Sequence, residues 1–514
     1  MVTSVRADHA CPPMSIGCAF AVTSLSATAR ALRQVRPFRV STKLAKKGPA
    51  VRSLRSSTTM ASLDTNPLAT WSYGLSATSK DAPDLPRWQS ITAEHVRPAI
   101  TDAVKAVNLE IDAIEKKLSE SKTPVSTWEE IMDPLERLSE KLSRPWGVVS
   151  HLKGVRDSED LRKAYDDMQP DVVTASLRIG QSRPVFDALV ALSENKQAWA
   201  NLSSAQKRAV ECEVRDATLS GVALDGKEKL RYNEIAKELS ALSTAFSNNV
   251  LDATKAFEHL CTEKSEVAGL PPSALEQAAQ TAQTRGGHTD ATPTNGPWMF
   301  TLDAPSYMAV RAHAENRALR EKTYKAYLTR ASEFFEKYAP AKDDDDSVSE
   351  KTKPIGNNAP LIEQILSLRL EKAKLLGYDN FAEVSMATKM ATLVSAEALL
   401  EDIRVKSKPA AERELAAIQA FAKEAGAAEA TEGLKQWDVG FWSERLREAK
   451  YELKEEDLRP YFQLPAVIDG MFDLAGTLFG TYFPNPGTPT FAGRPPVITR
   501  VTSRKTLTTF FYVS

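Results

Sequence analysis

The stretch Lys227–Leu260, KEKLRYNEIAKELSALSTAFSNNVLDATKAFEHL, carries the clearest folding pattern of the chain. Its apolar residues recur at steps of three and four, and they are Tyr232, Ile235, Leu239, Leu242, Phe246, Val250, Ala253, Phe257 and Leu260. This spacing places them on one face of a helix with about 3.6 residues per turn. The pattern predicts a continuous helix roughly 50 Å long, at about 1.5 Å per residue.

The same periodicity predicts several more helices on either side of this stretch. One begins after Pro98, and another follows Pro360 and ends near Gly377, a residue typical of helix C-caps. The predicted ranges are Ala99–Leu118, Pro360–Leu376, Glu397–Glu424 and Pro465–Phe479. The sequence therefore indicates a mainly α-helical fold.

Strand signals are scarce. Trp298–Asp303 alternates between apolar and polar residues and lies between two prolines, which predicts one short strand region near residues 298–304. Lys264–Gly296 is rich in proline and glycine and predicts an irregular connection with one short helix. We divide the chain into a leader (1–60), an N-terminal helical domain (61–265), this connection (266–305), a second helical region (306–480) and a tail (481–514).

Composition bounds the classes of function. The chain has 514 residues, enough for roughly three domains at about 150 residues each. Lys and Arg number 66 against 67 Asp and Glu, a balance that argues against a general nucleic-acid binder. No apolar run reaches the ~18 residues that predict a membrane-spanning helix. The four cysteines, Cys11, Cys18, Cys212 and Cys261, lack the paired spacing of a disulfide scaffold or zinc cluster.

The near-neutral charge hides an asymmetry. Residues 1–60 hold ten Lys or Arg and one acid, Asp8, giving +9, while the rest holds 56 bases and 66 acids, giving −10. A Ser- and Arg-rich, acid-poor N-terminus is typical of a transit peptide for chloroplasts or mitochondria. The alternative is a basic tail without a targeting role. Met60 would be a second start site that yields a cytosolic form.

The histidines give no local zinc motif. A catalytic zinc commonly uses His-Glu-x-x-His on one helix face, but no two of the histidines lie within twenty residues of each other. They are His9, His95, His151, His259, His288 and His313. His259 adjoins the apolar stripe, where a structural histidine is expected over a ligand. His288 lies in a glycine-rich loop and His313 on a charged helix, and neither has a partner motif.

Other catalytic signatures are also missing. The chain contains no Gly-x-Ser-x-Gly elbow, phosphate loop or dinucleotide fingerprint. Cys212 stands between two glutamates, which disfavour the thiolate that a nucleophile requires. The acidic run Asp343–Asp346 lies in a predicted exposed loop, Glu333–Asn358, and is interpreted as solvated surface rather than a calcium site. The residues alone assign no catalytic, cofactor-binding or metal-binding position.

A series of short motifs in a fixed order nevertheless resembles a known family, the M3 zinc oligopeptidases of the oligopeptidase A and thimet type, in particular the plant organellar enzymes. The motifs cover about residues 64–480. They are Asn66-Pro67-Leu68, ITAEHVRP (91–98), SNNVLDAT (247–254), LDAPSY (302–307), NRALRE (316–321), LLGY (375–378), ATKMA (387–391), WSER (442–445) and EDLRPYF (456–462).

This resemblance implies a helical protein whose two halves flank a channel for short peptides, cleaved targeting peptides among them. It also implies a Zn²⁺ ion held by the two His of His-Glu-x-x-His and a downstream Glu, with the Glu of the motif activating water. The chain contains no position that matches these ligands, so it is expected to be inactive as it stands. No nucleic-acid or membrane partner is implied.

After Gly480 the resemblance is expected to stop, and the tail Thr481–Ser514 is interpreted as unrelated to the family. In that case an apolar face at Val467, Met471, Phe472, Leu474 and Leu478 is left uncovered, which predicts association or poor solubility. Two hypotheses follow: a metallo-oligopeptidase truncated before its zinc motif, and a non-catalytic helical module that binds peptides or a partner.

Overall fold

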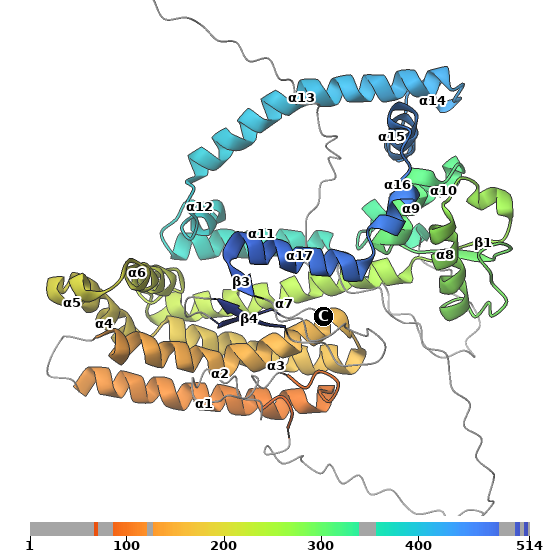
Figure 1. Cartoon of the computed structure of the whole chain (residues 1–514). Helices are drawn as coiled ribbons and strands as arrows, with labels where there is room; N and C mark the ends of the chain where they lie inside the picture. The colour runs from red at the N-terminus through yellow and green to blue at the C-terminus, as the bar shows by residue number, and fades with distance from the viewer. Residues whose placement is uncertain are drawn as a thin grey trace, which may run out of the picture.

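The computed structural model describes residues 66–69, 86–120, 127–338, 356–482, 499–503 and 508–511. Within these ranges the protein is mainly α-helical, which confirms the predicted fold class (Figure 1). The leader 1–60, Met60 and the run Asp343–Asp346 lie outside the described residues.

Helices form a layered body in the N-terminal half (Figure 1). The longest of them are α1 (Ala93–Glu120), α2 (Trp128–Val155), α3 (Glu159–Gly180) and α7 (Gly226–Ala256). Between α3 and α7 come α4 (Arg183–Glu194), α5 (Lys196–Asn201) and α6 (Ser204–Leu219). α1 contacts α2 and α3, and α3 contacts α7. Their facing stripes form one apolar core, in which Ile100, Ile111 and Leu138 are fully buried.

The start of α1 differs from the prediction. The helix begins at Ala93 rather than at Ala99, and Pro98 lies inside it. His95 explains the earlier start, because its Nδ1 accepts a hydrogen bond from the Thr92 amide at 3.1 Å. This contact satisfies one of the free N–H groups at the helix N-terminus, a task that capping side chains perform.

The end of α7 also differs from the prediction. The helix stops at Ala256, and Phe257 has an extended backbone. The chain then forms the short strand β1 (His259–Cys261), which pairs antiparallel with β2 (Trp298–Phe300), so that Leu260 lies opposite Met299. The predicted strand is therefore confirmed. Its partner strand, β1, includes Leu260, which the sequence pattern had assigned to the long helix.

The connection between these strands contains a short 3₁₀ turn, η2 (Lys264–Val267), and one helix, α8 (Pro272–Thr284), as predicted. After β2 come α9 (Ala304–His313) and α10 (Arg317–Leu328). A second apolar core joins β1, α8, β2 and α9, with Trp298 and Phe300 each 1% exposed.

The prediction that Glu333–Asn358 is an exposed loop is wrong for part of its described ends, where two residues are buried. Phe335 is buried in a third apolar cluster and is followed by η3 (Glu336–Tyr338). Asn358 is also buried, and its backbone amide donates to the Ala331 carbonyl at 2.8 Å. Both ends of the segment are therefore anchored on the body of the protein.

The remaining helices agree with prediction to within a few residues: α11 (Ala359–Leu375), α13 (Leu393–Glu424) and α17 (Leu464–Phe479). Gly377 adopts φ +80°, and its amide bonds to the Lys374 carbonyl, as a C-terminal glycine does. Shorter elements complete this part: α12 (Phe381–Met386), α14 (Glu429–Glu432), α15 (Gln436–Tyr451), α16 (Glu455–Leu458) and η4 (Arg459–Tyr461).

The apolar face predicted on α17 is open to solvent. Val467, Met471, Leu474 and Leu478 are between 46% and 66% exposed, while Phe472 is half-buried. None of the helices in the described ranges combines the length and the apolarity needed to cross a bilayer.

Beyond α17 the described chain forms strands, which the sequence did not indicate. β3 (Thr481–Tyr482) pairs antiparallel with β4 (Thr499–Ser503), which pairs antiparallel with β5 (Thr508–Phe511). The prediction of a single strand region was therefore incomplete.

Candidate functional site: a histidine and two glutamates between α9 and α15

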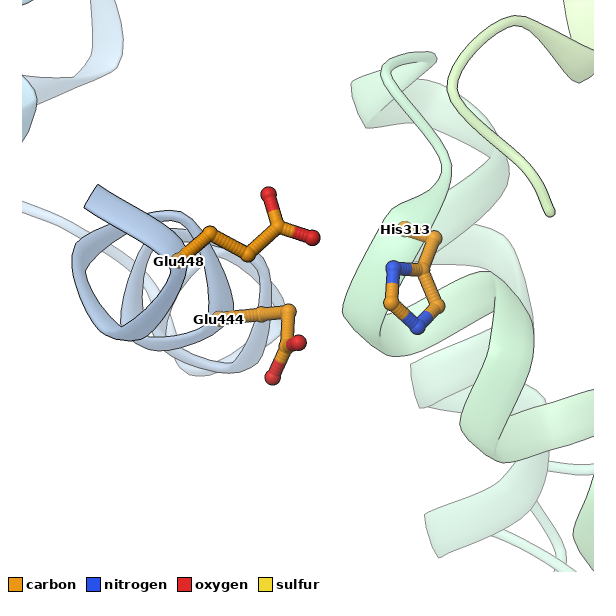
Figure 2. Close-up of side chains that lie close together, drawn as sticks. All are labelled: His313, Glu444 and Glu448. Carbon is orange, nitrogen blue, oxygen red and sulfur yellow. The ribbon is translucent and has the colours of Figure 1, made fainter. Parts of the chain in front are cut away.

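One group of chemically capable side chains lies where α9 meets α15. His313 ends α9, and Glu444 and Glu448 lie one turn apart on α15. One ligand atom from each residue lies within 4.8 Å of the other two, and all three residues are half-buried. Figure 2 shows both carboxylates reaching from α15 toward the imidazole on α9. We call these three residues the α9–α15 trio.

The close approach of the two helices depends on a glycine. A Cβ on Gly440 of α15 would lie 2.9 Å from Arg311 Nε and 3.3 Å from the Arg311 carbonyl oxygen on α9. A side chain at this position would displace Arg311, so Gly440 favours the close spacing that brings the carboxylates near His313. The end of α9 is fixed from the other side too, since a Cβ on Gly269 would lie 2.5 Å from the His313 carbonyl oxygen.

Two arginines orient the carboxylates of the trio. Arg447 Nη2 donates to Glu444 Oε1 at 2.5 Å, and Arg445 Nη1 donates to Glu448 Oε2 at 2.9 Å. Arg445 also reaches across to α9, where its Nη2 lies 3.4 Å from the His313 carbonyl oxygen. Each guanidinium thus binds one carboxylate oxygen and restricts the direction of the other.

A second charged cluster lies nearer the start of the same helix. Asp438 is fully buried and accepts hydrogen bonds from Arg317 Nε at 3.0 Å and Nη2 at 2.8 Å, and from Arg320 Nη2 at 3.1 Å. The backbone amide of Lys435 donates to Asp438 Oδ2 at 3.0 Å. The Arg320 side chain, 1% exposed, also donates to the Ala314 carbonyl at 2.8 Å. We call Asp438, Arg317 and Arg320 the Asp438 cluster.

Electrostatics keep the Asp438 carboxyl ionised. Burial alone would raise its pKa, but the hydrogen bonds from Arg317, from the Lys435 amide and from Arg320 outweigh that effect, so the pKa of Asp438 lies below its usual value of 3.8. The arginines stay protonated, because a guanidinium does not lose its proton in proteins. This cluster links α10 to α15 by charge and has the character of a structural ion pair.

Among the described residues, the other histidines do not come together in a site. His9 lies outside the described residues, His95 caps α1, and His151 is exposed against the Trp88 ring at 5.0 Å between centroids. His288 is half-buried in its loop. The sequence contains no partner motif for His313, and the fold brings two glutamates, distant in the sequence, close to it.

His259 lies on β1 rather than on the helix to which the stripe assigned it. Its Nδ1 is 2.9 Å from Lys322 Nζ. Burial and the charge of Lys322 lower the pKa of His259 and favour the neutral ring. The contact fits the structural role expected of this histidine.

The described cysteines do not form a nucleophilic site. Cys212 is half-buried and Cys261 is buried, and both are free thiols. Burial raises the pKa of Cys261 to about 12, so its thiol stays protonated at neutral pH.

Two cavities lie away from the trio. One, of about 290 Å³, lies between α3 and α7 and includes the polar residues Asp166, Gln169 and Lys237 in its lining. The other, of about 380 Å³, has a largely apolar lining that includes Val267, Leu275 and Trp298.

The trio does not reproduce the catalytic zinc site that the family resemblance implies. That site needs two imidazoles and a free glutamate as base, whereas the trio holds one imidazole and both of its carboxylates are bound by arginines. Within the described part of the chain it is the one group of three such side chains close enough to share an ion. No hydrolytic step is derived from it.

Comparison with known families identifies the class. Residues 100–229 match the N-terminal domain of neurolysin and thimet oligopeptidase, and residues 310–490 match peptidase family M3. The second match runs beyond Gly480, where we expected the resemblance to stop. The chain belongs to peptidase family M3, in agreement with the helical fold and with the motifs along its sequence.

Individual relatives narrow the similarity to the oligopeptidase A group. The chain is 48% identical over 397 residues to the organellar oligopeptidase A, chloroplastic/mitochondrial, and to the probable cytosolic oligopeptidase A, both of Arabidopsis thaliana. The alignments cover 77% of this chain and 46% and 52% of those proteins. Oligopeptidase A of Haemophilus influenzae is 39% identical, again over 77% of this chain and 53% of its own length. The chain thus spans about half the length of these relatives.

Proposed function

We propose that these residues belong to a zinc-dependent oligopeptidase that hydrolyses short peptides. The observation that supports this most is the 48% identity over 397 residues to two proteins named oligopeptidase A. The order of the family motifs along the helices adds to it. By resemblance, the helices of the N-terminal half would form one wall of the channel that admits the peptide.

We further propose that the 514 residues do not hydrolyse peptides on their own. They contain no His-Glu-x-x-His, and the α9–α15 trio lacks the second imidazole and the free base. Zinc, which the family implies, would then be held by residues outside this sequence. This part of the proposal is separate from family membership.

Turnover of an internally quenched peptide tests the second part. The purified chain is assayed with and without added Zn²⁺ and with a chelator. We expect no turnover above buffer in any condition. Zinc-dependent turnover that the chelator abolishes would contradict the expectation.

Full-length transcripts read across the codon for Gly480 test the first part. Messages that continue into a His-Glu-x-x-His segment would support a complete oligopeptidase. If every message instead ends at Ser514, the peptidase proposal fails for this product.

A second candidate is a non-catalytic helical module that binds peptides or a partner. The exposed apolar face of α17 favours it, because Met471, Leu474 and Leu478 are each more than half exposed and such patches often mark interaction surfaces. This reading requires a monodisperse, zinc-free protein. Light scattering measures the association state of Leu474→Glu and of a control, Leu328→Glu on α10 (62% exposed). Association that is lost only in Leu474→Glu indicates a specific interaction through α17 rather than non-specific hydrophobic association.

For location, we propose that residues 1–60 direct the protein to chloroplasts or mitochondria, and that a product starting at Met60 stays in the cytosol. The names of the two plant relatives, one organellar and one cytosolic, agree with this. In an organelle the substrates would include cleaved targeting peptides. Fusing residues 1–60 to a fluorescent protein tests whether they direct import into an organelle. Diffuse cytosolic fluorescence would contradict the proposed targeting.

A further inference from the structure

We propose that the α9–α15 trio is a binding site for one divalent transition-metal ion, distinct from the catalytic zinc of the family. The donors are one imidazole nitrogen from His313 and one carboxylate oxygen each from Glu444 and Glu448. They come from two helices that are far apart in the sequence and meet side by side. The inference does not depend on the proposed peptidase function.

The geometry is close to what an ion requires. Bonds from Zn²⁺ to nitrogen and oxygen are about 2.0–2.2 Å, so ligand atoms of a tetrahedral site lie roughly 3.4 Å apart. The three donor atoms here lie within 4.8 Å of one another. Rotation of the glutamate side chains closes the remaining gap without moving either helix, whose spacing is fixed at Gly440.

The surroundings support the carboxylates as ligands. Arg447 and Arg445 each bind one oxygen, Glu444 Oε1 and Glu448 Oε2 respectively, and so leave the second oxygen of each carboxylate to turn toward His313. Partners of this kind orient ligands in metal sites. Their positive charges also balance the two carboxylates, so we expect weaker binding than at a site of unpaired acids.

The donor set selects the kind of ion. An imidazole with two carboxylates suits Zn²⁺, Co²⁺ or Mn²⁺, whereas Ca²⁺ prefers oxygen ligands alone and Cu⁺ prefers sulfur. Because His313 and the glutamates belong to different helices, a bound ion would clamp α9 to α15. It would stabilise the packing of the second helical region without supplying hydrolytic chemistry.

Titration of the chelator-treated full chain with Co²⁺, followed by visible absorption, tests the site. We expect saturation at one Co²⁺ per chain and no sulfur-to-cobalt charge-transfer band, because the trio offers no thiolate. His313→Ala and Glu444→Gln should each weaken binding at least tenfold. The matched controls His288→Ala, in the loop, and Glu414→Gln, exposed on α13, should leave it unchanged.

The proposal would be overturned by a titration that does not saturate, by equal binding in His313→Ala, or by a charge-transfer band that places the ion on a cysteine. Circular dichroism first confirms that each variant is folded. Should His313→Ala unfold, Glu448→Gln provides the same test on α15, and paramagnetic shifting of one imidazole resonance in the unaltered protein reports the ligand directly. Absence of that shifted resonance at saturating Co²⁺ would also refute the site.

Discussion

Helix α15 carries two charged clusters with different characters. At its start, Asp438 is fully buried and accepts hydrogen bonds from Arg317 and Arg320 of α10. Two turns later, Glu444 and Glu448 face His313 of α9 from half-buried positions. In the first cluster the carboxylate is completely buried, whereas in the second each half-buried carboxylate has one oxygen bound by an arginine.

Burial accounts for the difference. A buried charge that loses its partner has no water to replace it, so the Asp438 cluster is expected to tolerate little change. Half-buried ion pairs are screened and contribute less to stability. The same helix therefore combines a buried structural ion pair with half-buried ion pairs that lie beside a histidine. Four predictions, from the largest expected effect to the smallest, test this contrast.

Asp438→Asn should cause the largest loss. The substitution leaves the buried Arg320 with Glu429, 3.6 Å away, as its remaining acidic partner. Breaking a buried pair in this way costs about 3–5 kcal/mol. Urea unfolding measures the effect. Asp402→Asn is the control, because Asp402 pairs with Lys406 in solvent, at 52% and 74% exposure, and should cost no more than about 1 kcal/mol. Equal losses in both variants would remove the contrast.

Lowering the pH should reproduce part of the stability loss expected of Asp438→Asn. The pKa of Asp438 in the folded protein is lowered from 3.8, so its contribution is complete above the unfolded value and disappears as the pH falls through the folded value. Unfolding free energies of the natural chain and Asp438→Asn should therefore differ at neutral pH and converge below about pH 3.8. Glu115 and Asp157, whose pKa values are also lowered, affect both proteins alike. Parallel curves down to the lowest pH would show that Asp438 is not the titrating group.

Gly440→Ala should have an intermediate effect that touches both clusters. The new methyl group would meet Arg311 at 2.9 Å, and such crowding costs about 1–3 kcal/mol, against about 1 kcal/mol gained in helix propensity. We expect a net loss in thermal stability together with weaker Co²⁺ binding. Gly154→Ala on α2, where a Cβ would have nothing within 4 Å, is the matched control and should be neutral or stabilising. A stabilising Gly440→Ala would show that the helix spacing is not constrained there.

Glu448→Gln should have the smallest effect on the metal-free protein. Its partner Arg445 is 27% exposed and Glu448 is 18% exposed, so the loss should stay at or below about 1 kcal/mol. Thermal unfolding in the presence of a chelator measures it. A loss as large as that of Asp438→Asn would mean that the two clusters are energetically alike.

Much of the fold was predictable from local patterns. The apolar periodicity indicated α11, α13 and α17, and Gly377 marked the end of α11 because a left-handed residue there favours glycine. The start of α1 was missed because a histidine, His95, accepts the hydrogen bond from the Thr92 amide that Glu or Gln usually accepts in a capping box.

Long-range pairing explains the other errors. Leu260 continues the helical stripe of α7, yet it lies in β1 because the segment pairs with Trp298–Phe300. A periodicity of 3.6 within one segment cannot report a partner strand elsewhere in the chain. The exposed face of α17, in contrast, was predicted correctly from the helix pattern and the family resemblance.

The candidate site could not be predicted for the same reason. His313 has no metal-ligand spacing to any neighbour in sequence, and Glu444 and Glu448 look like an ordinary charged helix face. Only the contact of α9 with α15 at Gly440 brings them together. The spacing of Glu444 and Glu448, one helical turn apart, was the single available signal, and surface glutamates share it.

The most direct test of the contrast along α15 is thermal unfolding of four proteins with and without saturating Zn²⁺: the natural chain, Asp438→Asn, His313→Ala and His288→Ala. Our account predicts that Zn²⁺ stabilises the natural chain and His288→Ala by about 2.7 kcal/mol at one hundred times the dissociation constant. It also predicts that Zn²⁺ stabilises Asp438→Asn, whose unfolding temperature without the ion is lower. It predicts no stabilisation of His313→Ala. Equal stabilisation of His313→Ala, or none in any protein, would contradict the account.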